Sequence, residues 1–97
     1  MISGSKFSNV EIGGESKITE IELQKGQAIA NHSHDCWVEH CYCLSGELMV
    51  YLEGDFKVKL TNGEKLQINS RSNHKILNVS EGVSNLLIIQ DAVRPGC

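Results

Sequence analysis

The stretch that decides the fold is GQAIANHSHDCWVEHCYCLSG, residues 26–46. It holds His32 and His34, two residues apart, and Glu39 five residues further on. On a β-strand, residues i and i+2 lie on one face, so both imidazoles can reach the same ion. After a bend, a strand that returns antiparallel to the first can bring Glu39 beside the two histidines. The stretch therefore predicts a metal site.

A fourth candidate ligand, His74, lies far along the chain, so only a closed or sandwiched sheet can bring it to the others. Any one histidine alone is more often a surface or core residue, but the four residues together favour a metal. Imidazole nitrogens and a carboxylate suit Fe(II), Mn(II), Ni(II), Co(II) or Zn(II) and disfavour Cu(I). Four protein ligands leave two positions of an octahedral ion open to a substrate or O₂.

Size, charge and hydropathy narrow the functional class. The chain has 97 residues, which predicts one domain near the small end of what folds on a single core. Its net charge is -3 and its basic residues form no patch, which disfavours a nucleic-acid or anionic-membrane partner. The N-terminal residues lack an apolar signal-peptide core, and the longest apolar run, residues 86–89, is too short to span a bilayer. We therefore expect a cytoplasmic protein.

The expected location also bears on the cysteines. Without a secretory signal, they are expected to be reduced thiols rather than a disulfide framework. They are Cys36, Cys41, Cys43 and Cys97.

Short strands separated by polar, glycine-containing turns are expected from residue 16 onward. The predicted strands span residues 16–23, 27–34, 39–44, 48–52, 56–60, 65–68, 74–79 and 83–90. Residues 35–38 are expected to form a bend or loop, and residues 1–14 an arm that can pack against a neighbouring subunit. No helix-length window keeps a 3.6-residue period, and turns recur about every 8–12 residues, as in all-β sandwiches and barrels.

Two spacings in the chain resemble the conserved motifs of the cupin superfamily. The first motif corresponds to Gly26, His32, His34, Glu39 and Gly46, with every interval kept. The second is matched in spacing by residues 63–78, GEKLQINSRSNHKILN, which end in His74 and Asn78. Asn69 stands where the motif usually has proline, and Arg71 where it usually has glycine; both are turn positions, so the two departures concern the loop conformation and not the ligand.

The resemblance is to small, single-domain cupins of the conserved-barrel type. It implies a double-stranded β-helix, or jelly-roll barrel, and a homodimer commonly built through N-terminal strands. It also implies that His32, His34, Glu39 and His74 bind one divalent metal at the barrel centre. Oxygenase, isomerase and lyase chemistries all occur on this fold. Two functions stay open: a metal-dependent enzyme acting on a small polar molecule, and a non-enzymatic small-ligand-binding or sensing module.

Four further residues are candidates for contact with a substrate or with the metal ligands: Trp37, Cys41, Cys43 and Arg71. Both cysteines share strand parity with Glu39, so we expect them in the barrel interior. There they are either metal-proximal thiols or small core residues, and the second is favoured because no basic neighbour is present to lower a thiol pKa.

The other two candidates lie next to predicted ligands: Trp37 in the expected bend between His34 and Glu39, and Arg71 just before His74. Trp37 can cover the barrel mouth, stack on a ligand or simply pack. Arg71 can pair with an anionic substrate or stay solvated, and the second is the plainer reading. His40 has the opposite parity to Glu39 and is expected on the outer face, as a surface or dimer-contact residue.

Overall fold

The structure is a computed structural model that describes residues 6–12, 16–32 and 36–92; for residues 6–12, 31 and 32 it describes the backbone alone. These residues form an all-β fold with one short 3₁₀ turn, Glu53–Asp55. The strands are β1 Lys6–Ile12, β2 Ser16–Leu23, β3 Ala28–His32, β4 Trp37–Ser45, β5 Glu47–Leu52, β6 Phe56–Thr61, β7 Lys65–Ile68, β8 His74–Asn78 and β9 Ser84–Ala92.

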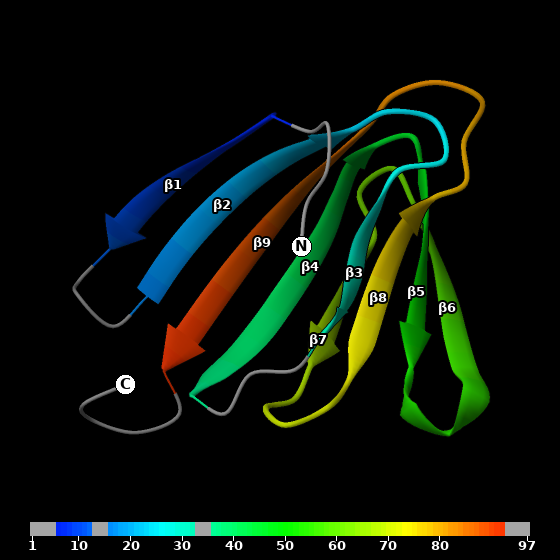
Figure 1. Ribbon diagram of the computed structural model, residues 1–97. Helices are drawn as coiled ribbons and strands as arrows, with labels where there is room; N and C mark the ends of the chain where they lie inside the picture. Colours follow the sequence, from blue (N-terminus) through cyan, green and yellow to red (C-terminus); the bar gives the residue numbers. More distant parts are fainter. Residues whose placement is uncertain (1–5, 13–15, 33–35, 93–97) are drawn as a thin grey trace.

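The strands form two antiparallel sheets that face each other. The five-stranded sheet has the order β1-β2-β9-β4-β7, and the four-stranded sheet has the order β3-β8-β5-β6. Figure 1 shows β1, β2, β9 and β4 side by side on one flank and β8, β5 and β6 on the other. Strands that follow each other in the chain often lie in different sheets, as β3 and β4 do. This arrangement is the jelly roll expected from the sequence.

The core lies between the sheets and follows strand alternation. Twelve apolar side chains that are nearly or wholly inaccessible to solvent form it: Ile21, Leu23, Ile29, Cys41, Cys43, Leu48, Val50, Leu60, Ile68, Ile76, Leu86 and Ile88. On β4, β5, β8 and β9 the buried residues occupy every second position. Each of these strands therefore turns one face to the core and the other outward.

The strand boundaries agree with the sequence prediction in most places, and β2 and β7 have the predicted bounds. The predicted bend at residues 35–38 is wrong in its second half, because β4 already begins at Trp37. Trp37 and Val38 pair with Ala92 and Asp91 of β9, which runs two residues further than predicted. The extra ladder gives their backbone groups partners that a loop would lack.

β3 departs from simple alternation, which would put Ala28, Ala30 and His32 on one face. Ile29 is buried while Ala30 is exposed. The register against β8 shifts between Ile29, opposite Ile76, and His32, opposite His74. Such a shift is a β-bulge, in which one extra residue in one strand changes the alternation. The bulge lets Ile29 reach the core and still sets the backbone of His32 opposite that of His74.

Within the N-terminal arm, residues 6–12 form strand β1. β1 pairs along its whole length with β2, from Lys6 opposite Glu22 to Ile12 opposite Ser16. It forms one end of the five-stranded sheet (Figure 1). Within the described residues, no helix has the length and apolar character needed to cross a membrane.

The expectation that all the cysteines are reduced is wrong at Cys36, which is disulfide-bonded. Cys97 lies outside the described residues, whereas Cys41 and Cys43 are free thiols. The prediction rested on the expected redox compartment, which carries no information on whether two sulfurs lie within bonding distance.

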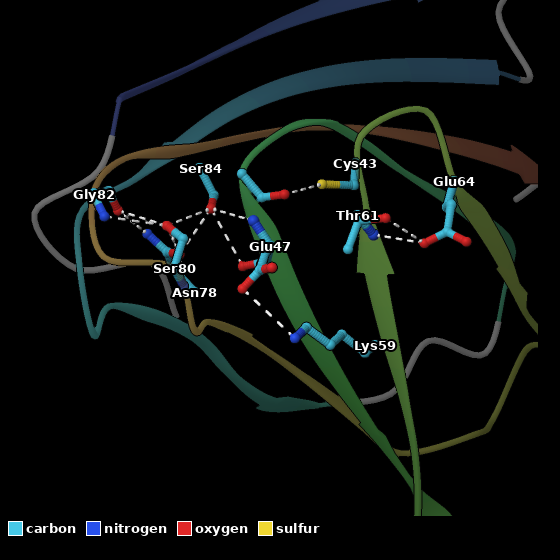
Figure 2. Close-up of polar contacts among 10 residues, drawn as sticks. Cys43, Glu47, Lys59, Thr61, Glu64, Asn78, Ser80, Gly82 and Ser84 are labelled. Atoms are coloured by element: carbon cyan, nitrogen blue, oxygen red, sulfur yellow. Dashed lines mark hydrogen bonds and ion pairs between the residues drawn. The ribbon is translucent and has the colours of Figure 1, made fainter.

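Asn78, the last residue of the second motif, ties the turns together at one end of the barrel (Figure 2). Its side-chain amide donates to the carbonyls of Leu23, Gln24 and Gly82 at 2.8–3.0 Å. The side-chain oxygen Oδ1 of Asn78 accepts hydrogen bonds from the backbone amide and the hydroxyl of Ser80 and from the hydroxyl of Ser84. Because both the NH₂ group and the oxygen of this buried amide are hydrogen-bonded, Asn78 fixes the conformations of the turns it contacts.

Candidate metal centre

Two of the four predicted ligands meet between the sheets. Glu39 lies on β4 of the five-stranded sheet, and His74 is the first residue of β8 in the four-stranded sheet. The Nε2 atom of His74 lies 2.9 Å from Oε2 of Glu39. Both residues are almost wholly buried, with exposed fractions of 1% for His74 and 2% for Glu39. Residues 35 positions apart in sequence are thus brought into direct contact by the closure of the barrel.

The imidazole of His74 is held by a second contact. Its Nδ1 atom lies 2.9 Å from the carbonyl oxygen of Ser72. A carbonyl can only accept, so Nδ1 carries the proton and Nε2 is directed at Glu39. Burial lowers the pKa of His74, but the hydrogen bonds to Glu39 and Ser72 and the charge of Glu39 outweigh it, so this pKa lies above the ordinary value of 6.5.

The second oxygen of Glu39 also has a partner, which sequence reasoning missed. The amide of Gln90 on β9 donates to Oε1 of Glu39 at 2.9 Å. A signal for this residue was present in the sequence: Gln90 continues the inward row of Leu86 and Ile88, where alternation calls for an apolar side chain.

The donor pair fits a divalent ion. Two adjacent ligands of a six-coordinate ion, each about 2.1 Å from it, lie about 3.0 Å apart, close to the 2.9 Å between Nε2 of His74 and Oε2 of Glu39. An imidazole nitrogen fixed by a carbonyl and a carboxylate fixed by an amide is the arrangement found around metal ligands. Among the described side chains, no group of three or more His, Cys, Asp or Glu residues is placed to hold an ion.

The other two predicted ligands are not described to the same extent. The backbone of His32 lies directly opposite that of His74 in the β3–β8 ladder. His34 lies outside the described residues. The structure therefore brings Glu39 and His74 together and sets the backbone of His32 opposite that of His74.

Cys41 and Cys43 follow Glu39 on the inward face of β4 and are both fully buried. Burial, followed by the charges of Glu39 and Cys43, raises the pKa of the Cys41 thiol to about 12. Burial, followed by Glu64 and Glu47, also raises the pKa of Cys43. A thiol that stays protonated is a poor nucleophile and ligand, so in the metal-free protein both residues behave as core side chains.

Trp37 and Arg71 have different surroundings. Trp37 is half-buried and has the parity of Glu39, two residues away on β4. Arg71 is exposed in the loop before His74 and has a positive φ of 65°. His40 lies on the outer face of β4, as expected, with Nε2 3.3 Å from Oδ2 of Asp91.

A surface pocket of about 460 Å³ is separate from this centre. It is lined by residues of the end of β5, the 3₁₀ turn that follows and the start of β8 with the residue before it: Tyr51, Leu52, Glu53, Gly54, Asp55, Asn73 and Lys75. Tyr51 and Lys75 are exposed and alternate with the buried Val50 and His74, so the pocket opens on the outer face of the four-stranded sheet.

Sequence comparison agrees with this geometry. A family model described as "Cupin domain" matches residues 19–89, which is more than half of the chain. The chain belongs to the cupin family. No curated protein matches it by sequence.

Solved cupin structures share the fold at low sequence identity. KdgF from Halomonas sp. has a TM-score of 0.84 and 18% identity, over 95% of this chain and 82% of that one. A predicted oxalate decarboxylase from Thermotoga maritima has a TM-score of 0.82 and 19% identity, over 93% and 85%. Recombinant oxalate oxidase in complex with glycolate has a TM-score of 0.80 and 18% identity, over 96% of this chain. The chain spans only 53% of that oxidase, about half its length.

Proposed function

We propose that this cupin is a metal-dependent enzyme acting on a small polar molecule, with one divalent ion held by His32, His34, Glu39 and His74. The observation that carries the proposal is the 2.9 Å approach of His74 Nε2 to Glu39 Oε2 from opposite sheets. Burying an imidazole and a carboxylate costs free energy unless the two groups pair with each other or bind an ion. The contacts of Ser72 with His74 and of Gln90 with Glu39 orient both groups, as is usual for metal ligands, and so support a bound ion.

The residues around the pair define what the site can do. A bound ion of this kind would supply Lewis acidity and stabilise negative charge on a coordinated substrate. The carbonyl of Ser72 keeps the proton of neutral His74 on Nδ1, which leaves the lone pair of Nε2 available to bind an ion. Cys41 and Ile76, the next inward-facing residues after Glu39 and His74 on their strands, are fully buried, so water is excluded on the core side.

Metal analysis of protein purified without oxygen tests the proposal. We expect about one transition-metal ion per chain, lost in His74→Ala and kept in the matched variant His40→Ala, because His40 lies on the outer face. Oxygen consumption and product formation are then measured with a panel of small acids, thiols and sugars.

Each result of this experiment has a defined reading. Turnover of one compound that depends on His74 supports the enzyme. Stoichiometric metal without turnover of any compound favours a non-enzymatic binding or sensing module. A wild-type chain that takes up no metal, with a His74→Ala variant of unchanged stability, overturns the metal site.

We also propose that the protein is a homodimer formed through its N-terminal strand. The position of β1 at the end of the five-stranded sheet supports this, because an edge strand has backbone groups on one side that can pair with another chain. Sedimentation analysis should give a dimer for the full chain and a monomer after removal of residues 1–14. A monomeric full chain would contradict the proposal.

A further inference from the structure

Gln90 is a polar residue in an otherwise apolar inward row of β9. It lies directly opposite Glu39 of β4, and its parity is that of Leu86 and Ile88, which belong to the core. A half-buried amide is unfavourable unless its hydrogen bonds are made. An apolar residue would fill this position at lower cost, so the contact made by the amide needs an explanation.

Among the described side chains, the two oxygens of Glu39 face different partners. Gln90 Nε2 donates to Oε1 at 2.9 Å, while Oε2 lies 2.9 Å from Nε2 of His74. The assignment of the amide is fixed by chemistry, because an ionised carboxylate only accepts and the NH₂ group of Gln90 must face it. One carboxylate oxygen is thus tied to β9, and the other faces the candidate metal position.

We propose that Gln90 is a positioning residue that makes Glu39 a ligand through Oε2 alone. The inference rests on the proposed function, since it concerns the same ion. Binding of the ion by both oxygens would require Oε1 to leave the amide of Gln90, so the hydrogen bond favours one-oxygen binding. A carboxylate that occupies one coordination position instead of two leaves one more for a substrate.

A purely structural role for Gln90 makes a different prediction. If the amide only satisfies a buried carboxylate, its loss lowers the stability of the metal-free protein and leaves metal affinity and geometry unchanged. If it positions Glu39, its loss changes the affinity for the metal and the electronic spectrum of the bound ion. Co(II) reports both, because its visible absorption depends on the number and arrangement of its ligands.

The test compares Gln90→Met with Gln67→Met. Methionine keeps the length of glutamine and removes the donor. Gln67 is the matched control, since it is exposed on β7 and reaches only Asn69, at 3.4 Å. We expect Gln90→Met to bind Co(II) about 10–100-fold more weakly than wild type by titration calorimetry, with an altered absorption spectrum. Gln67→Met should match wild type in both.

The second variant, Gln90→Asn, stays polar but is one methylene too short to reach Glu39, and the same loss is expected. It keeps the inference testable if Gln90→Met does not fold. A folded Gln90 variant with wild-type Co(II) affinity and spectrum overturns the inference alone. A wild-type protein that does not bind Co(II) overturns the proposed function, and the role of Gln90 with it.

Discussion

At the scale of single residues, Arg71 has a strained backbone conformation, and it stands at a position where the motif predicts glycine. Its φ of 65° lies in the left-handed region, at the position where the second cupin motif usually has glycine. A non-glycine residue in this region lowers the free energy of unfolding by roughly 1–2 kcal/mol. Glycine removes this strain, but the greater conformational freedom it gives the unfolded chain offsets about 0.4–1 kcal/mol of the gain.

Arg71→Gly is therefore expected to raise the free energy of unfolding by about 0.5–1 kcal/mol in urea titrations. Ser70→Gly, one residue earlier and without a positive φ, should lower it. If Arg71 contacts an anionic substrate, Arg71→Gly will also raise KM. A stability equal to or below that of wild type would show that the loop can relax without glycine.

His74 gives the metal-free protein a dependence on pH. Its folded-state pKa lies above the ordinary value of 6.5, so protonated His74 stabilises the fold below that pH. The contribution is lost as the pH rises through the folded-state value. We expect the unfolding free energy in the presence of a chelator to fall as the pH rises above 6.5, and to fall less in His74→Gln.

The outer-face variant His40→Gln should keep the fall that wild type shows. With Co(II) present the trend reverses, because proton and ion compete for Nε2 of His74 and affinity rises with pH. An identical fall in wild type and His74→Gln would place the titrating group elsewhere.

At the scale of elements, the turn between β4 and β5 depends on Gly46 for two reasons that can be separated. Its φ is +91°, and an added Cβ would overlap the Ser84 side chain and lie 2.9 Å from the Cα of Ser84. Gly63, with a φ of +82°, has no atom within 4 Å of such a Cβ. Gly63→Ala should therefore cost only about 1–2 kcal/mol, the price of the backbone conformation.

Gly46→Ala should cost about 3 kcal/mol or more, since the overlap with the β9 backbone adds to the conformational term. Thermal and urea unfolding of both variants measure the difference. Equal losses in the two variants would mean that β9 moves away freely, contrary to the Asn78–Ser84 hydrogen bond that holds it.

The elements also show what sequence patterns could and could not predict. β-Branched residues and the turn residues that follow located β2 and β7 to the residue, because each is a short, regular strand. The bulge in β3 was not predictable, since it depends on how β8 lies beside it. Gln90 was missed for a similar reason: its partner Glu39 lies on another strand, and only the β4–β9 register brings the two together.

At the scale of the whole molecule, the candidate metal centre connects the two sheets. Glu39 belongs to the five-stranded sheet and His74 to the four-stranded sheet, so an ion bound by both would cross-link the barrel. The motif spacings identified these two residues, but their meeting depends on a closed fold. An ion can be bound by both residues only in the folded state, because the unfolded chain does not hold the ligands together.

Metal binding should therefore raise the stability of the entire domain. At a free Co(II) concentration about 100 times Kd, the expected gain is about 2.7 kcal/mol. For a chain of this size, that gain corresponds to a rise in Tm of roughly 10–20 °C. Differential scanning calorimetry with and without Co(II) measures it, and a chelator should reverse it. Glu39→Gln keeps the shape of the side chain but weakens the ligand, so its Tm should respond much less. A Tm that Co(II) leaves unchanged in wild type would mean that the contact between Glu39 and His74 is a buried ion pair between the sheets and not a metal site.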